Sequence, residues 1–206
     1  IKSSNISYIY DLISRNVKHI SSVLNRPLKH LFNAIIACGE FPNCLKVTRV
    51  VPVFKQGDIN LPENYRPISI VPIFGKIFEI LIKKSLSQYL QKYKILHESQ
   101  FGFRENHSTI QAVAKVVEDI VDGLERGEQI GLTLCDLSKA FDCVSHRLLL
   151  SKLSRYGIRG LPLRIFQSYL DFRTQCVCLE DDTSDMRVMV NGVPQGSVLG
   201  PVLFLL

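Results

Sequence analysis

The sequence of 206 residues lacks any apolar run long enough to cross a membrane, since no window reaches the roughly 18 apolar residues that a span requires. The first residues also lack the apolar stretch of a signal peptide. The six cysteines include no C-x-x-C pair and no cysteine–histidine set at zinc spacing, so we expect buried free thiols in a reducing compartment. The absences together predict an intracellular protein without a membrane partner.

Acidic residues are scarce in the first half of the chain. Residues 1–104 contain 15 Lys and Arg against 6 Asp and Glu, a net charge of +9, whereas residues 105–206 contain 10 against 13, a net charge of −3. A basic half joined to a slightly acidic half is typical of a protein that grips a polyanion with one part and holds cations with the other. Chance variation of surface charge explains the same numbers equally well.

Internal repeats are absent, and the chain divides into a helix-rich first half and a mixed second half. The chain does not begin with Met and stops in an apolar run, so we expect a piece of a longer polypeptide. Apolar periodicity and turn residues predict an α+β fold with its sheet mostly in the C-terminal half. The expected helices are residues up to 38, 75–93, 108–127 with a Ser108 or Thr109 cap, 146–157 and 161–173. The expected β-segments are 47–58, a buried strand 129–137, and a hairpin 175–190 with Cys176 and Cys178 on one side.

Asp136 is the first candidate for chemistry, because it ends the apolar run of the predicted strand. A carboxylate in that place is costly unless it has a partner. One interpretation is a structural cap of the next turn. The other is a magnesium ligand, since magnesium takes few protein carboxylates and completes its shell with phosphates and water. Such ions support two-metal phosphoryl transfer.

The residues that follow Asp136 fit the same interpretation. A turn there would direct the backbone N–H groups of residues 138–140 toward a bound phosphate. It would also set the ring of Phe141 under a sugar, where the ring can exclude a 2′-hydroxyl. Plain core packing is the alternative for Phe141. Asp142 either caps the next helix or pairs with Arg147.

Five stretches of the sequence carry a resemblance to a known family. "FPNCLKVTRVVPVFKQGD", "ENYRPISIVPIFGKIFEILI", "SQFGFRENHST", "CDLSKAFDCV" and "GVPQGSVLGPVLF" occur in this order. The chain, from about residue 30 to its end, resembles the reverse transcriptase domain of non-LTR retrotransposons. Group II intron proteins and telomerase are related polymerases, but these motifs favour the retrotransposon branch.

The resemblance implies an RNA-directed DNA polymerase that adds deoxynucleotides to a primer 3′-hydroxyl. It implies a right-hand polymerase fragment, with helical basic fingers followed by a partial palm with an antiparallel sheet. The expected regions are an N-terminal helical extension (1–38), fingers (39–127) and a partial palm (128–206). The implied partners are an RNA template, a DNA primer, deoxynucleoside triphosphates and the remainder of a polyprotein, in a ribonucleoprotein of cytoplasm and nucleus.

The resemblance also implies roles for single residues. Asp136 matches the first catalytic aspartate and metal ligand, and the main-chain carbonyl of Leu137 matches a neighbouring metal contact. Phe141 matches the sugar-discriminating residue, and Gln195 a residue that touches the incoming nucleotide or the template base pair. The remaining nucleotide-binding residues are Lys55, Arg66, Ser138, Lys139 and Ala140, and the template- and primer-binding residues are Arg104 and Gly196.

One motif of the family is missing from this sequence. The second aspartate pair, in a Tyr/Phe-Ala-Asp-Asp turn, would come some tens of residues after Leu206. The complete enzyme would hold two Mg²⁺ ions, and one carboxylate does not offset their charge. We therefore expect the 206 residues alone to be inactive. The competing hypothesis is a non-catalytic nucleic-acid-binding relic or domesticated fragment.

Overall fold

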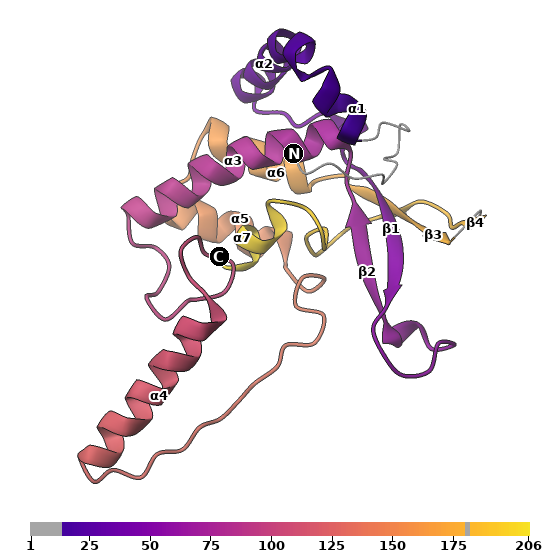
Figure 1. Ribbon diagram of the computed structural model, residues 1–206. Coiled ribbons are helices and arrows are strands. Elements are labelled where there is room, and N and C mark those ends of the chain that lie inside the picture. Colours follow the sequence, from indigo (N-terminus) through magenta and orange to yellow (C-terminus); the bar gives the residue numbers. More distant parts are fainter. Residues whose placement is uncertain (1–13, 180–181) are drawn as a thin grey trace.

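The computed structural model describes residues 14–179 and 182–206, which fold into seven α-helices and a mixed sheet of five strands (Figure 1). The helices are α1 (Ser14–His19), α2 (Ser21–Cys38), α3 (Ile73–Lys92), α4 (Thr109–Glu125), α5 (His146–Arg155), α6 (Leu161–Leu170) and α7 (Gly200–Phe204). The strands are β1 (Val47–Phe54), β2 (Tyr65–Ile70), β3 (Thr174–Leu179), β4 (Asp182–Thr183) and β5 (Arg187–Val188). The α+β fold class is thus confirmed.

The sheet is more mixed than the sequence indicated. The strand order is β2-β1-β3-β4, with β5 also paired to β3. β1 is antiparallel to β2 but parallel to β3, where Thr48 lies opposite Gln175. A parallel pair needs a long crossover, here the whole chain from β2 through α6. The expected antiparallel sheet of residues 128–206 is confirmed, because β3 pairs antiparallel with both β4 and β5. The expectation of a sheet mostly in the C-terminal half was wrong, because β1 and β2 belong to the first half.

The core forms around α3, which crosses the body of the molecule with α5 and α7 on one side and α2 on the other, while α6 packs against both α2 and α5 (Figure 1). Phe78 of α3, Leu153 of α5 and Leu170 of α6 are almost fully buried. Each such side chain stabilises the fold by about 1.5–3 kcal/mol relative to an exposed one. The core therefore joins the first and last thirds of the chain into one body.

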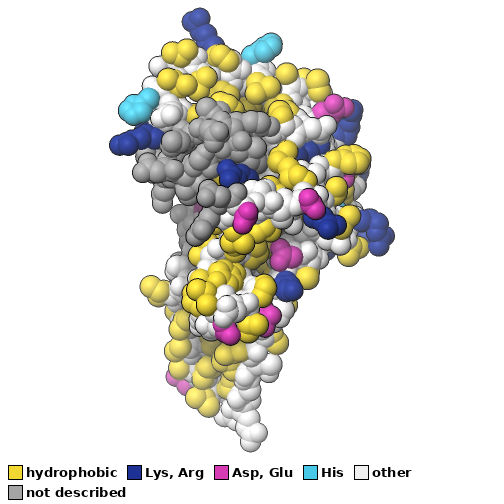
Figure 2. Space-filling view, turned by 90° about the vertical axis from the view of Figure 1, so that its right-hand side faces the viewer, with side chains coloured by type: hydrophobic (Ala, Val, Ile, Leu, Met, Phe, Trp, Pro, Cys, Tyr) yellow, Lys and Arg dark blue, Asp and Glu magenta, His cyan; other side chains and the backbone are white. Residues whose placement is uncertain are grey.

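α4 lies outside this body as a projecting arm (Figure 1). Its start was predicted correctly: the Ser108 hydroxyl accepts from the backbone N–H of Gln111, and the Gln111 amide oxygen accepts from the Ser108 N–H. Its apolar stripe, however, is exposed, with Val117 52% accessible. Hydrophobic side chains gather over the narrow lower part of the molecule in Figure 2, which is this arm.

Residues 129–137 return from the arm as exposed coil, and Leu134 is 86% accessible. The prediction of a buried strand here was wrong. A strand requires a hydrogen-bonded neighbour, and among the described strands none pairs with this segment. The alternation of apolar residues indicates that this segment can form a strand, but none of the described strands lies beside it to pair with.

The remaining sequence predictions have mixed outcomes. Cys38, Cys44, Cys135 and Cys143 are exposed, so the expectation of buried thiols holds only for Cys176 and Cys178. These two do share the buried side of β3. In the part of the chain that the structure describes, no helix combines the length and apolar character of a membrane span.

Candidate nucleotide and nucleic-acid site

Two loops that are far apart in the sequence lie directly against each other. The first is the turn at residues 138–143, and the second is the loop at residues 191–199 before α7. The N–H of Val193 donates to the Phe141 carbonyl at 2.9 Å, and the N–H of Gly192 to the Val144 carbonyl at 2.7 Å. A Cβ on Gly192 would come within 2.9 Å of the Asp142 backbone, so this close approach requires glycine.

The second loop is also joined to β2. The N–H of Ser69 donates to the Gln195 carbonyl at 2.7 Å. Gly196 has φ of +126°, and a Cβ there would lie 2.7 Å from the Ser69 carbonyl oxygen. The predicted residues Gln195 and Gly196 are therefore fixed beside the strand that carries Arg66.

The β1–β2 hairpin places two predicted nucleotide-binding cations on one face. Arg66 is the direct partner of Val53, and Lys55 follows Val53 by two residues, so the side chains of Lys55 and Arg66 lie on the same face. Both are exposed. Phe54 and Tyr65 pair on the opposite face with ring centroids 5.4 Å apart. The hairpin thus offers an exposed pair of positive charges that no described acidic residue neutralises.

Phe141 is half-buried in an aromatic cluster. Its ring centroid lies 5.1 Å from that of Phe204 and 5.8 Å from that of Phe103. The ring is therefore held by packing, as the alternative interpretation of the sequence required. Since it is only half-buried, part of the ring also stays accessible.

The backbone around this turn has free donors. Lys139 has φ of +51°, and its carbonyl accepts from the N–H groups of Asp142 and Cys143 at 2.9 and 3.1 Å. Among the described residues, the N–H groups of residues 138–140 find no acceptor. An exposed turn with successive unpaired N–H groups is suited to bind an anion.

Asp136 lies in the exposed coil before this turn. Within the described part of the chain, its carboxylate forms no hydrogen bond and no ion pair. Its chain separation from Phe141 is five residues, which limits the distance to roughly 17 Å. The role of Asp136 beside a bound nucleotide stays a prediction.

A magnesium site does not form from these residues alone. No group of three or more His, Cys, Asp or Glu side chains comes together among the described residues. Asp136 and the Leu137 carbonyl, both on exposed coil, offer one charged and one neutral oxygen ligand. This donor set does not fit a protein-bound magnesium ion without further ligands.

Asp142 has neither of its expected roles among the described residues. Ser145 is the N-cap of α5, accepting from the Leu148 N–H at 3.4 Å, and Asp142 forms no ion pair with Arg147. Ser145 is a better cap because it directly precedes the first helical residue.

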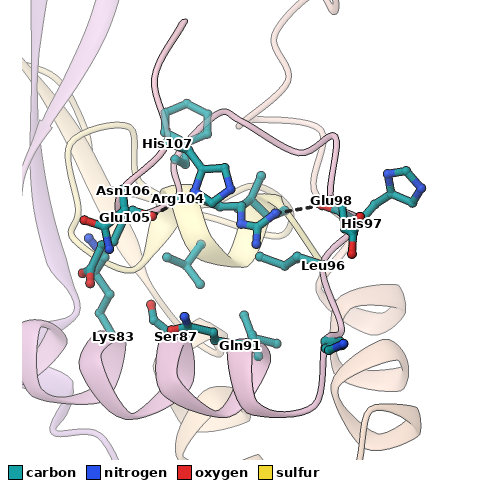
Figure 3. A pocket seen from close by; sticks show the side chains of 15 residues that line it. Lys83, Ser87, Gln91, Leu96, His97, Glu98, Arg104, Glu105, Asn106 and His107 are labelled. Atoms are coloured by element: carbon teal, nitrogen blue, oxygen red, sulfur yellow. Dashed lines mark hydrogen bonds between the residues drawn. The ribbon is translucent and has the colours of Figure 1, made fainter. Parts of the chain in front are cut away.

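Arg104 lies in a cavity of about 560 Å³ between α3, the loop at residues 94–107 and the end of α7 (Figure 3). Its Nη1 donates to the carbonyls of His97 and Gln100 at 2.8 and 3.2 Å. Arg104 therefore holds its own loop together, and its contact with a template stays a prediction. Lys83 of α3 lines the same cavity and is a second cation there.

Sequence reasoning missed the residues that hold the site in place. Glu79 of α3 and Tyr169 of α6 are buried and hydrogen-bonded to each other, and Glu79 also accepts from the Val198 backbone. His146 Nε2 lies 2.7 Å from the Gly192 carbonyl. The signal for Glu79 was visible in the sequence, because it is an acidic residue directly between the apolar Phe78 and Ile80 of a predicted helix.

Comparisons with known proteins give a consistent result. Residues 53–206 match the model of the family described as reverse transcriptase (RNA-dependent DNA polymerase). The chain is 35% identical over 181 residues to the probable RNA-directed DNA polymerase from transposon BS of Drosophila melanogaster. It is 35% identical over 175 residues to the RNA-directed DNA polymerase from mobile element jockey of the same fly. Each match covers 84% of this chain and 19% of the relative.

A more distant relative is the retrovirus-related Pol polyprotein from type-1 retrotransposable element R2 of Popillia japonica. It is 26% identical over 167 residues, which are 81% of this chain and 23% of the relative. The chain thus spans about a fifth of the length of the curated relatives that it matches.

Proposed function

The chain belongs to the reverse transcriptase (RNA-dependent DNA polymerase) family, and from this premise we propose that it forms the fingers and the first part of the palm of an RNA-directed DNA polymerase. The relatives are polymerases of non-LTR elements such as jockey, and the match extends over most of this chain. The reaction of the complete enzyme would add a deoxynucleotide to the 3′-hydroxyl of a DNA primer on an RNA template.

One set of backbone contacts carries the proposal. The hydrogen bonds from Val193 to Phe141 and from Ser69 to Gln195 join three motifs that are far apart in the sequence. Each of these motifs contributes a residue whose chemistry suits a nucleoside triphosphate on a primer terminus. The tertiary fold brings the three motifs together, since they belong to different elements that are not neighbours in the sequence.

The triphosphate would be bound from two sides. Arg66 and Lys55 supply positive charge from one face of the hairpin, and a guanidinium meets phosphate oxygens in pairs. The unpaired N–H groups of Ser138, Lys139 and Ala140 would donate to the same phosphates from the turn. Such fixed donors orient the nucleotide because they require no rearrangement when it binds.

The two joined loops would contact the sugar and the base of the nucleotide. The accessible part of the Phe141 ring would lie under the sugar and exclude a 2′-hydroxyl. Gln195 would contact the incoming nucleotide or the template base pair, and Gly196 would let the nucleic acid approach the backbone without a Cβ. Arg104 would lie near the template.

We propose magnesium binding only for the complete enzyme. Asp136 and the Leu137 carbonyl would be two of its ligands, and bound magnesium would neutralise charge on the phosphates. Because the described residues do not form a metal site, we expect the 206 residues by themselves not to extend a primer. The remaining partners would be the rest of a polyprotein, in the cytoplasm and nucleus.

Nucleotide binding tests the proposal. A fluorescent deoxynucleoside triphosphate is titrated into the chain with an RNA template–DNA primer and magnesium. Arg66→Ala should raise the nucleotide Kd about tenfold or more, because a charge-assisted hydrogen bond contributes about 1.5–3 kcal/mol. Lys152→Ala, which removes an exposed cation of α5, is the matched control and should leave the Kd unchanged. Equal affinities of wild type and Arg66→Ala would contradict the proposal.

The second candidate function is nucleic-acid binding without catalysis. The first half of the chain is basic, and no carboxylate cluster forms among residues 14–179 and 182–206; both features favour this candidate. The same titration separates the two: a non-catalytic binder holds the primer–template but shows no saturable nucleotide binding.

A further inference from the structure

A buried polar chain crosses the body beneath the loop at residues 191–199. Glu79 is 1% accessible, and its two carboxyl oxygens have different partners. One oxygen accepts from the Tyr169 hydroxyl at 2.9 Å. The other accepts from the backbone N–H of Val198 at 2.6 Å and, more weakly, from that of Leu199 at 3.4 Å. A single side chain of α3 thus connects α6 to the end of the loop.

Arg173 continues this chain to the sheet. Its Nη1 donates to the Tyr169 carbonyl at 3.3 Å, its Nη2 to the Thr48 hydroxyl at 3.3 Å, and its guanidinium lies 4.7 Å from the centre of the Tyr169 ring. All of these side chains are almost fully buried. The loop is therefore linked through Glu79, Tyr169 and Arg173 to β1, the strand that leads to Lys55.

Burial of these charges has a cost that packing alone does not explain. An apolar residue of similar size at position 79 would fill the core without the desolvation penalty of a carboxyl group. It would also leave the partly buried N–H of Val198 and the buried N–H of Leu199 without an acceptor, which is unfavourable. The carboxyl group is therefore required by the loop and by Tyr169 of α6 rather than by α3 itself.

The loop depends on such contacts because it has no regular structure of its own. The hydroxyl of Ser197 accepts from the Gly200 N–H and donates to the Pro194 carbonyl, each at 2.9 Å. Outside this internal turn, Ser69 binds the loop at Gln195 and Glu79 binds it three residues later. Gln195 thus lies between two anchor points, one on the sheet and one on α3.

We propose that Glu79 is a positioning residue, which fixes the loop from Pro194 to Leu199 and so holds Gln195 in place for substrate. The proposal rests on the proposed function only for the contact between Gln195 and substrate. Glu79 is too deeply buried to touch nucleotide or template, so it acts through the loop.

Three substitutions separate the chemistry of Glu79 from its size. Glu79→Gln keeps an oxygen for the Val198 N–H, and its amide can donate to the Tyr169 oxygen, so it should hold the loop as the wild type does. Glu79→Ala removes both contacts. Tyr89→Phe is the control, because it removes another hydrogen bond of α3, from the Tyr89 hydroxyl to the Tyr156 carbonyl at 2.8 Å, away from the loop.

Amide hydrogen exchange tests whether Glu79 fixes the loop. In Glu79→Ala the amides of Val198 and Leu199 should exchange about tenfold faster or more, because a donor shielded from water that loses its acceptor costs about 1–3 kcal/mol. The amides in the middle of α3 should keep their wild-type rates, and so should the amides of Val198 and Leu199 in Glu79→Gln. Unchanged loop exchange in folded Glu79→Ala would overturn the proposal. If Glu79→Ala does not fold, Tyr169→Phe, which removes only the hydroxyl that orients the carboxyl group, takes its place with the same expectation.

Epistasis with Gln195 decides whether the positioning matters for substrate. Glu79→Ala should weaken nucleotide binding in the presence of primer–template about tenfold, but should have little further effect in a Gln195→Ala background. A merely structural role predicts equal losses in both backgrounds, which would overturn the proposal. No effect of Gln195→Ala alone would instead contradict the proposed function of Gln195, while the exchange data would still decide the positioning.

Discussion

Gly196 offers a sharp test of how the loop is held against β2. Its φ of +126° is unfavourable for any residue with a Cβ, and that Cβ would lie 2.7 Å from the Ser69 carbonyl oxygen. The backbone strain costs about 1–3 kcal/mol. If the loop moves to relieve this contact, the Ser69–Gln195 hydrogen bond breaks, which costs about 0.5–1.5 kcal/mol more. Gly196→Ala should therefore lower the free energy of unfolding by roughly 2–4 kcal/mol.

Two other glycines separate the contributions. Gly127 has φ of +74° with no atom near its missing Cβ, so Gly127→Ala measures the backbone strain alone. Gly131 has neither a positive φ nor a neighbour within 4 Å, so Gly131→Ala should be neutral or slightly stabilising. Urea unfolding followed by far-ultraviolet circular dichroism gives all three values. If Gly196→Ala costs no more than Gly127→Ala, the close contact with Ser69 does not constrain the loop and the reasoning is refuted.

Four more predictions follow from individual contacts. Burial raises the pKa of Glu79 above its usual value of 4.5, so above that pH the folded protein keeps a proton that the unfolded chain has released. The stability of the wild type relative to Glu79→Gln should therefore fall as pH rises from about 4.5 to the pKa of the folded state. A difference in urea midpoints that does not change with pH would disprove this. Ser108→Ala should cost about 1 kcal/mol in helix stability and speed amide exchange in the first turn of α4, with unchanged exchange as the contrary result. Val117→Lys should reduce binding of a hydrophobic dye and self-association in light scattering, because it places a charge in the exposed stripe of α4; equal dye binding would show that the stripe is covered. Phe141→Ala, in a protein whose residues after Leu206 are supplied by the jockey relative, should admit ribonucleotides in a kinetic comparison, and unchanged sugar selectivity would remove Phe141 from this role.

Local features of the fold could be predicted from the sequence, since their determinants lie within a few residues. The helix at 108–127 is an example, because its Ser108 cap and Val117 stripe are both read from neighbouring positions. The strand predicted at 129–137 failed because a strand depends on a partner that no local pattern specifies. The parallel pairing of β1 with β3 was hidden for the same reason, since Thr48 and Gln175 are far apart in the chain.

The candidate site, like the fold, could be predicted only in part from the sequence. The motifs identified Lys55, Arg66 and Gln195, whose chemistry is visible in a short stretch. The sequence did not show that Lys55 and Arg66 share a face, which depends on the hairpin register. It also did not show that Glu79 supports the Gln195 loop, because that contact joins residues more than a hundred positions apart.

The central claim is that the hairpin, the turn at 138–141 and the loop at 193–196 together bind one nucleotide. Photoaffinity labelling with an azido-dATP on an RNA template–DNA primer, followed by mass spectrometry of the peptides, tests it most directly. The account predicts labels within residues 55–66, 138–141 and 193–196, all competed by unmodified dATP. Competed labels confined to α1, α2 or α4 would contradict it.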